Sequence, residues 1–222
     1  GPTAGMGAAR TVASHYSIMV KGLSQLFAAG PAVAAAIGET VDKEQLGGTE
    51  IHCRNGVVDE EVESEAQAFA TARRFLSYLP SSVDTLAARA ACDDPVDRRE
   101  QALLSTVPRS PAQVYAMRRV LTQVFDAGSV FEMGRRWGRA VITAFARLDG
   151  WPVAVLASDP YFYGGRWTTD ASHKVTRFVD LAQTFHLPVV HLVDNPGFVI
   201  GTKAAPSSVS RSEMSVASRA SA

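Results

Sequence analysis

The 222-residue sequence has few cysteines, no surplus of either charge and no apolar run long enough to cross a bilayer. Its two cysteines, Cys53 and Cys92, are too few for a disulfide framework and lack the spacing of metal ligands, so we expect a reducing compartment. The 22 basic and 22 acidic side chains cancel, which argues against nucleic acid as the main partner, because phosphate binding requires a basic surplus. The most apolar early stretch, residues 26–37, is interrupted by Gly30-Pro31 and is too short to span a membrane.

The chain also lacks an initiator methionine and a basic leader, because it opens with Gly1-Pro2-Thr3-Ala4-Gly5. We therefore expect it to be a fragment of a longer protein. Hydrophobic residues make up 46% of the sequence, which is enough to build a packed core in one large domain or two small ones.

Apolar periodicity predicts secondary structure in three regions. In the first region it predicts a strand over 17–20 and helices over 32–37, 41–46 and 60–79. Residues 81–128 are punctuated by proline and carry one predicted helix, 112–125, so we interpret them as an inter-domain connector outside any core. The alternative is a helical hairpin packed within one domain.

After Gly128 the pattern is that of an α/β protein. Strands are predicted over 140–148 and 152–157, joined by Asp149-Gly150, a strong two-residue hairpin signal. A glycine- and aromatic-rich loop, a helix over 170–186 and a strand over 187–193 follow. This order predicts a mixed or parallel sheet with a crossover helix. The serine-rich residues 206–222 cannot cover a core and are predicted to be disordered.

The segment Gly5-Met6-Gly7 is half of a dinucleotide-binding fingerprint, but no strand is predicted before it, so a nucleotide site is disfavoured. Two interpretations remain. Glycines at a helix start can expose backbone N–H groups that stabilise an enolate or tetrahedral oxyanion, or they can form a tight turn that only serves packing.

Several further motifs follow in a fixed order. They are Gly47-Gly48-Thr49-Glu50-Ile51-His52, Gly56-Val57-Val58-Asp59, Asp93-Asp94-Pro95, Gly150-Trp151-Pro152-Val153, Asp170-Ala171 with Lys174 and Arg177-Phe178, and Asp194-Asn195-Pro196-Gly197-Phe198 with Gly201. Over residues 1–204, this ordered set resembles the carboxyltransferase (beta) subunit of biotin-dependent acyl-CoA carboxylases of the propionyl-CoA and methylcrotonyl-CoA type.

The resemblance implies an α/β fold of the ClpP/crotonase type, a β-β-α superhelix, present as two partial domains. Residues 1–80 would be the C-terminal half of the N-terminal carboxyltransferase domain. Residues 81–128 would be the connector, residues 129–205 the front part of the C-terminal domain, and residues 206–222 the tail.

The activity implied by the resemblance is transfer of a carboxyl group from carboxybiotin to the α-carbon of an acyl-CoA. Gly5, Met6 and Gly7 would be the backbone donors to the thioester oxygen, although the family often has glycine where Met6 stands. The implied substrate-binding residues, at the entry of carboxybiotin, are Gly164, Gly165, Pro196, Gly197 and Phe198. In a crotonase-like half-domain, the loop of Gly164-Gly165 and the turn of Pro196-Gly197 are expected to open on the same edge of the sheet, at the carboxyl ends of strands.

The implied cofactor is biotin carried on a partner, with acyl-CoA as substrate and no metal. The implied partners are a biotin carboxylase or biotin carboxyl carrier subunit and further copies of the chain in a hexamer, with neither nucleic acid nor membrane. The compartment would be the cytoplasm or the mitochondrial matrix. Alternatives are the carboxyltransferase chain of a biotin-dependent decarboxylase, or an inactive truncated piece that only associates with other subunits. Because a second glycine-rich oxyanion segment of the family is not found, we predict that the 222 residues alone are inactive.

Other reactive side chains are given structural roles. His52 and Cys53 are adjacent and would point to opposite faces of an extended segment, so they are not predicted to form a catalytic pair. His173, His186 and His191 lack neighbours at metal-ligand spacing.

The aromatic residues and the cations of the last helix are likewise expected to be structural. Trp151, Trp167 and the tyrosines of 161–163 are expected to pack. Lys174 and Arg177 are expected to be solvated, a phosphate or subunit contact being the alternative.

Overall fold

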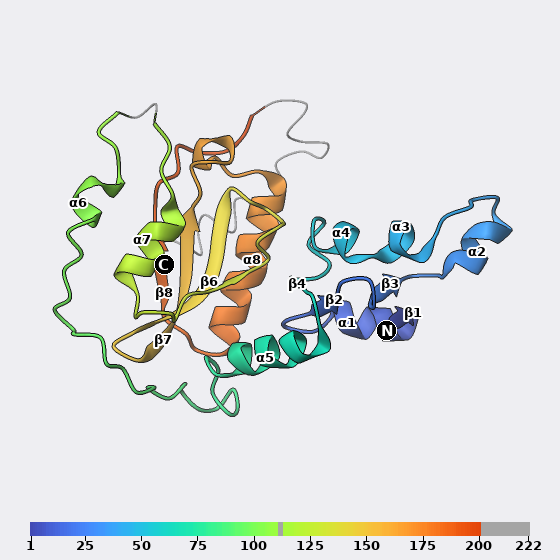
Figure 1. Ribbon diagram of the computed structural model, residues 1–222, viewed down its shortest axis with the longest axis horizontal. Coiled ribbons are helices and arrows are strands. Elements are labelled where there is room, and N and C mark those ends of the chain that lie inside the picture. Colours follow the sequence, from blue (N-terminus) through green and yellow to red (C-terminus); the bar gives the residue numbers. More distant parts are fainter. Residues whose placement is uncertain (111–112, 201–222) are drawn as a thin grey trace. The chain divides into compact units, whose positions relative to one another are not determined.

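The structure, a computed structural model, describes residues 1–110 and 113–200 (Figure 1). The chain divides between Phe75 and Leu76 into two compact units, which we call unit 1 and unit 2. The predicted tail, 206–222, lies outside the described residues.

Unit 1 consists of short elements around two small parallel sheets, β1 with β3 and β2 with β4. In chain order they are β1 Pro2–Ala4, α1 Met6–Val12, β2 Ile18–Val20, β3 Gln25–Phe27, α2 Pro31–Ala36, α3 Lys43–Gly47, α4 Thr49–His52, β4 Glu60–Val62 and α5 Glu65–Leu76. The core gathers side chains from several of these elements, namely Ala8, Met19, Leu26, Cys53 and Val58.

The predicted helix over 60–79 is wrong at its start. Residues 60–62 form β4, which pairs with β2 in the register Ile18 to Glu60. The helix α5 begins only after Ser64, whose hydroxyl accepts a hydrogen bond from the Gln67 amide at 3.3 Å. A three-residue strand depends on a partner far away in the sequence, which periodicity cannot reveal.

The glycine pair at 47–48 allows α3 to lie directly on β3. A Cβ atom at Gly47 would lie 2.2 Å from the carbonyl oxygen of Leu26 and 2.6 Å from the Phe27 ring. Only a residue without a side chain permits this approach.

Unit 2 is built on one four-stranded sheet in the order β5-β6-β7-β8. Its elements are α6 Leu103–Thr106, α7 Met117–Val124, β5 Phe131–Met133, β6 Val141–Leu148, β7 Trp151–Ser158, the short turn η1 Tyr163–Gly165, α8 Thr169–Thr184 and β8 Val189–Leu192. The first three strands are antiparallel, and α8 crosses over so that β8 runs parallel to β7. The predicted crossover helix is confirmed, and of the two predicted alternatives, a mixed or a parallel sheet, the mixed sheet is observed.

The helices α7 and α8 cover opposite faces of the sheet (Figure 1). Alternate residues of β6, beginning with Ile142, pack against Leu121 and Phe125 at the α7 side. The intervening Phe145 contacts the ring of Phe178 on α8, with ring centroids 5.7 Å apart. This alternation follows from the two-residue period of a strand.

The β6–β7 turn has the predicted form. Asp149 and Gly150 have φ angles of 49° and 77°, as a two-residue hairpin with left-handed central residues requires.

The segment predicted as a connector contributes to the core of unit 2. Met117, Leu121 and Phe125 are buried in its main cluster, so the expectation that this segment lies outside any core is wrong for α7. The helix is also shorter than the predicted 112–125, since it begins at Met117. Of the alternative interpretation, a helical hairpin packed within one domain, the packing within one domain holds for α7.

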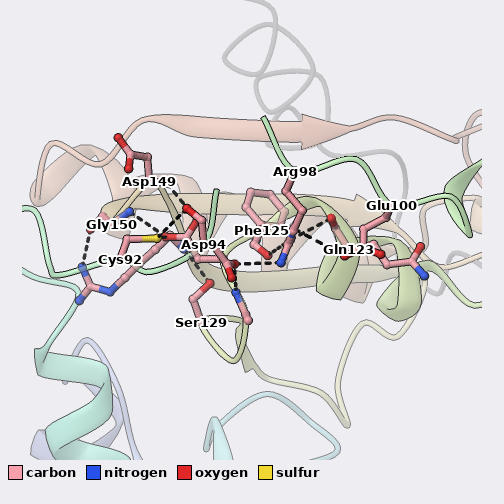
Figure 2. A network of polar contacts seen from close by, with 12 residues as sticks. Cys92, Asp94, Arg98, Glu100, Gln123, Phe125, Ser129, Asp149 and Gly150 are labelled. Carbon is pink, nitrogen blue, oxygen red and sulfur yellow. Dashed lines mark hydrogen bonds and ion pairs between the residues drawn. The ribbon is translucent and has the colours of Figure 1, made fainter. Parts of the chain in front are cut away.

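Residues 89–100, which we call the strap, are fastened to this unit by polar contacts (Figure 2). Arg98 donates to the carbonyl oxygens of Gln123, at 3.0 Å, and Phe125, at 2.8 Å. It therefore supplies hydrogen bonds to carbonyl groups at the C-terminal end of α7, which have no partner within the helix. Its guanidinium also pairs with Asp94 at 2.8 Å.

The other end of the strap lies against the β6–β7 hairpin (Figure 2). The carboxylate of Asp126 accepts hydrogen bonds from the amides of Asp149, at 2.9 Å, and Gly150, at 2.7 Å, and from the Cys92 thiol, at 3.3 Å. The Ala90 amide donates to the Gly150 carbonyl oxygen at 3.0 Å. The strap is therefore part of unit 2.

Candidate functional site

The glycine-rich start of the chain forms a turn from β1 into α1. The expectation that no strand precedes this segment is wrong, because Pro2–Ala4 pairs with β3, a partner distant in the sequence. Gly5 precedes the helix with a φ of 58° and a ψ of −126°, a conformation that glycine adopts readily. The first helical hydrogen bond runs from the Ala9 amide to the Gly5 carbonyl oxygen at 3.1 Å. The amides of Met6 and Gly7 lie in the first turn, where a helix offers no acceptor, and they have none elsewhere among the described residues.

Gly5 differs from its two neighbours. Its amide donates to the Phe27 carbonyl oxygen of β3 at 3.2 Å, so the prediction of three unpaired amides is wrong at this position. The Met6 side chain is 72% exposed and contributes little to the core. A Cβ atom at Gly7 would lie 2.8 Å from Cγ2 of Thr3. The chemistry available here is therefore that of two successive backbone N–H groups.

A second pair of this kind lies in the loop after β7. Tyr163, Gly164 and Gly165 all have left-handed φ angles, of 55°, 61° and 77°. The Gly165 amide donates to the Phe162 carbonyl oxygen at 2.9 Å, but the amides of Tyr163 and Gly164 have no acceptor within the part of the chain that the structure describes. A left-handed tyrosine is a costly conformation of the kind that clusters at functional sites.

The turn after β8 lies against this loop. The Trp167 amide donates to the Gly197 carbonyl oxygen at 3.0 Å, and the Val199 amide donates to the Trp167 carbonyl oxygen at 2.9 Å. Phe198 forms a bridge to Trp167, and the two rings meet edge to face with centroids 6.1 Å apart. The prediction that the Gly164-Gly165 loop and the Pro196-Gly197 turn open on the same sheet edge is confirmed, because they follow the carboxyl ends of the parallel strands β7 and β8.

Trp167 lies at the centre of this edge. It is 5% exposed, and its indole nitrogen is buried without a hydrogen-bond partner among residues 1–110 and 113–200. The ring of His191 on β8 lies 6.5 Å from the Trp167 ring, and burial lowers the pKa of this imidazole. Trp167 packs, as predicted.

Other residues of this region do not follow the prediction. Trp151, Tyr161 and Tyr163 are exposed and do not pack into the core. Lys174 is 4% exposed, not solvated, because its ammonium group donates to the Val141 carbonyl oxygen at 2.8 Å. A buried cation on the polar side of a periodic helix gives no signal in the sequence.

His52 has the structural role that was predicted, but the predicted extended segment is wrong, because His52 is the last residue of α4. Its Nε2 lies 2.7 Å from the carbonyl oxygen of Leu26, within unit 1. No group of three or more His, Cys, Asp or Glu side chains that could hold a metal ion is found in the described ranges. None of the helices described here is long and apolar enough to cross a membrane.

A cluster of ion pairs next to the loop after β7 was not predicted from the sequence. Arg118 of α7 pairs through two nitrogens with both carboxylate oxygens of Glu132, at 2.8 and 2.6 Å, and also with Asp159. Hydrogen bonding to Glu132 raises the pKa of the Arg118 guanidinium further. These three residues come from α7, β5 and the end of β7, so only the folded sheet brings them together.

Comparison with known proteins gives one consistent match. The carboxyl transferase domain family matches residues 1–212. The chain is 35% identical over 91% of its length to the propionyl-CoA carboxylase beta chain of Roseobacter denitrificans. It is 34% identical, again over 91%, to the methylmalonyl-CoA decarboxylase subunit alpha of Veillonella parvula. In both cases the chain spans 40% of the relative's length.

Solved structures agree with the sequence matches. Transcarboxylase 12S, described as a hexamer assembly with hydrolyzed methylmalonyl-coenzyme A bound, superposes with a TM-score of 0.92 at 30% identity, covering 99% of this chain and 44% of that one. A single-chain, multi-domain long-chain acyl-CoA carboxylase gives a TM-score of 0.83 at 27% identity, covering 99% of this chain and 22% of that one. The predicted α/β fold class of the crotonase type is confirmed.

Proposed function

Since this chain belongs to the family of carboxyl transferase domains, we propose that it forms part of a biotin-dependent carboxyltransferase. The reaction is the transfer of a carboxyl group from carboxybiotin to the α-carbon of an acyl-CoA such as propionyl-CoA. The propionyl-CoA carboxylase beta chain of Roseobacter denitrificans, at 35% identity, supports this substrate class.

One structural observation carries the proposal. Each unit offers two successive backbone amides with no acceptor among the described residues, Met6 and Gly7 in unit 1 and Tyr163 and Gly164 in unit 2. Carboxyl transfer requires donors to two oxygen atoms, the thioester oxygen of the acyl-CoA and the ureido oxygen of biotin. The family's second glycine-rich segment is not found in the sequence, so the amides of Tyr163 and Gly164 are proposed as additional donors at the entry of carboxybiotin. Backbone N–H groups held in a fixed turn are suited to oxygens that gain negative charge, because they need no reorganisation during the reaction.

In the proposed mechanism, the amides of Met6 and Gly7 donate to the thioester oxygen and stabilise the negative charge that develops there when the α-proton leaves. This proton would pass to the ureido nitrogen of biotin once that nitrogen has given up the carboxyl group. Biotin, when bound, supplies the carboxyl group. Its ureido oxygen accepts hydrogen bonds, which fits the free amides of Tyr163 and Gly164 and the bare backbone at Gly165. The turn of Pro196, Gly197 and Phe198 borders the same site. The chain would therefore bind and polarise both substrate oxygens through its backbone N–H groups.

The proposed partners are those of a biotin-dependent system. Biotin would be carried on a biotin carboxyl carrier or biotin carboxylase subunit, and copies of the protein would assemble into a hexamer, as the transcarboxylase 12S structure is described. The proposed compartment is the cytoplasm, or the mitochondrial matrix in a eukaryote, for which the human propionyl-CoA carboxylase beta chain, named as mitochondrial, is a precedent.

A second candidate is carboxyl transfer in the reverse direction. The alpha subunit of methylmalonyl-CoA decarboxylase from Veillonella parvula is 34% identical, nearly the same as the carboxylase relative. The two directions use the same two oxygen sites, so the free amides are equally suited to both.

A chimera tests the proposal. The matched segment of the Roseobacter beta chain is replaced by the corresponding residues of this chain, and the purified chimera receives a carrier protein whose biotin holds a ¹⁴C-labelled carboxyl group. Formation of labelled methylmalonyl-CoA from propionyl-CoA, above a control without protein, supports the proposal. A chimera that is folded and hexameric but transfers no label contradicts it. Supplying methylmalonyl-CoA and unlabelled carrier measures the reverse direction.

A further inference from the structure

Two side chains at the start of α7 reach the two loops of the candidate site. The Tyr115 hydroxyl donates to Oδ2 of Asp194 at 2.7 Å, and Arg118 pairs with Oδ2 of Asp159. Asp194 begins the turn 194–198, and Asp159 begins the loop 159–166. One short segment of chain therefore holds both loops.

Asp159 fixes the first turn of its loop. Its side chain is 1% exposed, and its second oxygen, Oδ1, accepts the Tyr161 amide at 3.2 Å. Its backbone carbonyl oxygen accepts the Phe162 amide at 3.1 Å. A buried carboxylate needs a charged partner, and Arg118 is the cation that pairs with it in the described part of the chain.

Arg118 is itself held in place from a third element. The two hydrogen bonds to Glu132 of β5 fix the plane of its guanidinium, which leaves the third nitrogen directed at Asp159. Lysine, with a single ammonium group, cannot make this bridge to two carboxylates in the same geometry. The ion pairs of Arg118 therefore fix the position of the loop relative to β5.

The neighbouring Ser158 connects the loops a second time. Its hydroxyl accepts the Asp194 amide at 3.3 Å. Tyr115 thus holds the side chain of Asp194 while Ser158 holds its backbone. The turn is fixed relative to β7 from two sides.

We infer that Arg118 and Tyr115 are positioning residues, which set the spacing between the amides of Tyr163 and Gly164 and the turn Pro196-Gly197-Phe198. The importance of this spacing for catalysis rests on the proposed function. A buried ion pair is a weak source of stability compared with apolar packing, whereas a donor displaced by about 1 Å costs on the order of 10² in rate. The expected result of loosening Arg118 is therefore local displacement of the loop.

Amide hydrogen exchange measured by NMR on the 222-residue chain tests the positioning directly. In Arg118→Lys we expect the amides of Phe162 and Gly165 to exchange at least about tenfold faster, while amides of the central strand β6 change less than about twofold. In Tyr115→Phe the faster exchange should be confined to Trp167 and Val199, whose amide hydrogen bonds join the loop to the turn.

Arg135→Lys is the matched control. The Arg135 guanidinium also approaches Glu132, at 3.8 Å, but is largely exposed and makes no contact with Asp159. Its exchange pattern should equal that of the wild type. Uniform acceleration across the sheet of unit 2 in Arg118→Lys, which a merely structural role predicts, or no acceleration at all, would overturn the inference.

Kinetics of the chimera separate this inference from the proposed function. Arg118→Lys should lower kcat at least about tenfold and leave KM for the acyl-CoA within about threefold, whereas Arg135→Lys changes neither. An unchanged kcat in Arg118→Lys overturns the catalytic part of the inference. If the folded chimera without further substitutions transfers no carboxyl group, the proposed function fails, and the exchange data alone decide whether Arg118 and Tyr115 position the loops.

Discussion

A Cβ atom added at Gly165 would lie 2.6 Å from the carbonyl oxygen of Asp194, so the loop after β7 and the turn after β8 meet through bare backbone. This contact brings the two segments of the candidate site in unit 2 together. It also explains why a residue without a side chain stands at this position, where φ is 77°.

Replacement of Gly165 by alanine should therefore separate the loop from the turn. We expect Gly165→Ala to lower the free energy of unfolding by about 2–4 kcal/mol, because the left-handed backbone costs about 1–2 kcal/mol and the clash with Asp194 adds to it. Urea denaturation followed by tryptophan fluorescence measures this change.

Gly164→Ala is the control for that substitution. Gly164 is also left-handed, but the nearest atom to its added Cβ is a side-chain nitrogen of Arg166 at 3.6 Å. Only the backbone cost of about 1–2 kcal/mol is expected. Equal losses in the two variants would show that the close approach to Asp194 contributes nothing.

The hydrogen bond between Cys92 of the strap and Asp126 predicts that this carboxylate controls the reactivity of the thiol. Partial burial and the hydrogen bond to the Asp126 carboxylate raise the pKa of the Cys92 thiol. Asp126→Asn removes the negative charge and presents an NH₂ group to amides that need an acceptor, so the strap should loosen and the thiolate fraction should rise. We expect iodoacetamide to modify Cys92 several times faster at pH 7.5, as measured by mass spectrometry of the labelled peptide.

Asp93→Asn is the matched control for the strap, because Asp93 is exposed and lies next to Cys92 in the sequence. Its labelling rate should stay close to that of the wild type. A similar acceleration in both variants would mean that net charge, and not the Asp126 hydrogen bonds, controls the thiol.

His191 predicts a pH dependence of stability. Burial lowers the pKa of its imidazole, so the unfolded chain binds a proton more readily than the folded chain. The free energy of unfolding should therefore fall as the pH drops below the usual histidine pKa of about 6.5. Above that pH the imidazole is neutral in both states, so its ionisation does not lower the free energy of unfolding. In His191→Gln the change in urea midpoint between pH 7.5 and 6 should be smaller. An identical change in the urea midpoint of wild type and variant would show that His191 does not cause the pH dependence of stability.

Strands β6, β7 and β8 of unit 2 could be predicted because their signals are local, whereas the three-residue strand β5 was not predicted. Asp149-Gly150 supplies left-handed residues to the hairpin, and the apolar stripe of α8, with Val175 and Phe178, has a clear helical period. The placement of the Gly164-Gly165 loop and the turn at Gly197 on one sheet edge followed from the rule that the carboxyl ends of parallel strands share one edge.

What could not be predicted depends on partners distant in the sequence. The strand β4 needs β2, and Lys174 can be buried only because the Val141 carbonyl oxygen lies within its reach. The amide of Gly5 is used by Phe27, a contact across β1 and β3 that no motif records. Arg118 looks like an ordinary cation on the polar side of a helix until the sheet brings two carboxylates to it.

The most direct test of the central claim, that the backbone N–H groups after Gly5 stabilise the thioester oxygen, is the kcat of carboxyl transfer in the chimera carrying Met6→Pro. Proline lacks the N–H group but is well tolerated as the first residue of a helix, and Gly5, with φ 58° and ψ −126°, can precede it. Met6→Ala, which retains the amide, is the control. We predict that Met6→Pro lowers kcat by about 10²-fold and Met6→Ala by less than about threefold, since one oxyanion donor is worth 10²–10³ in rate. Equal kcat values for the two variants would contradict the account.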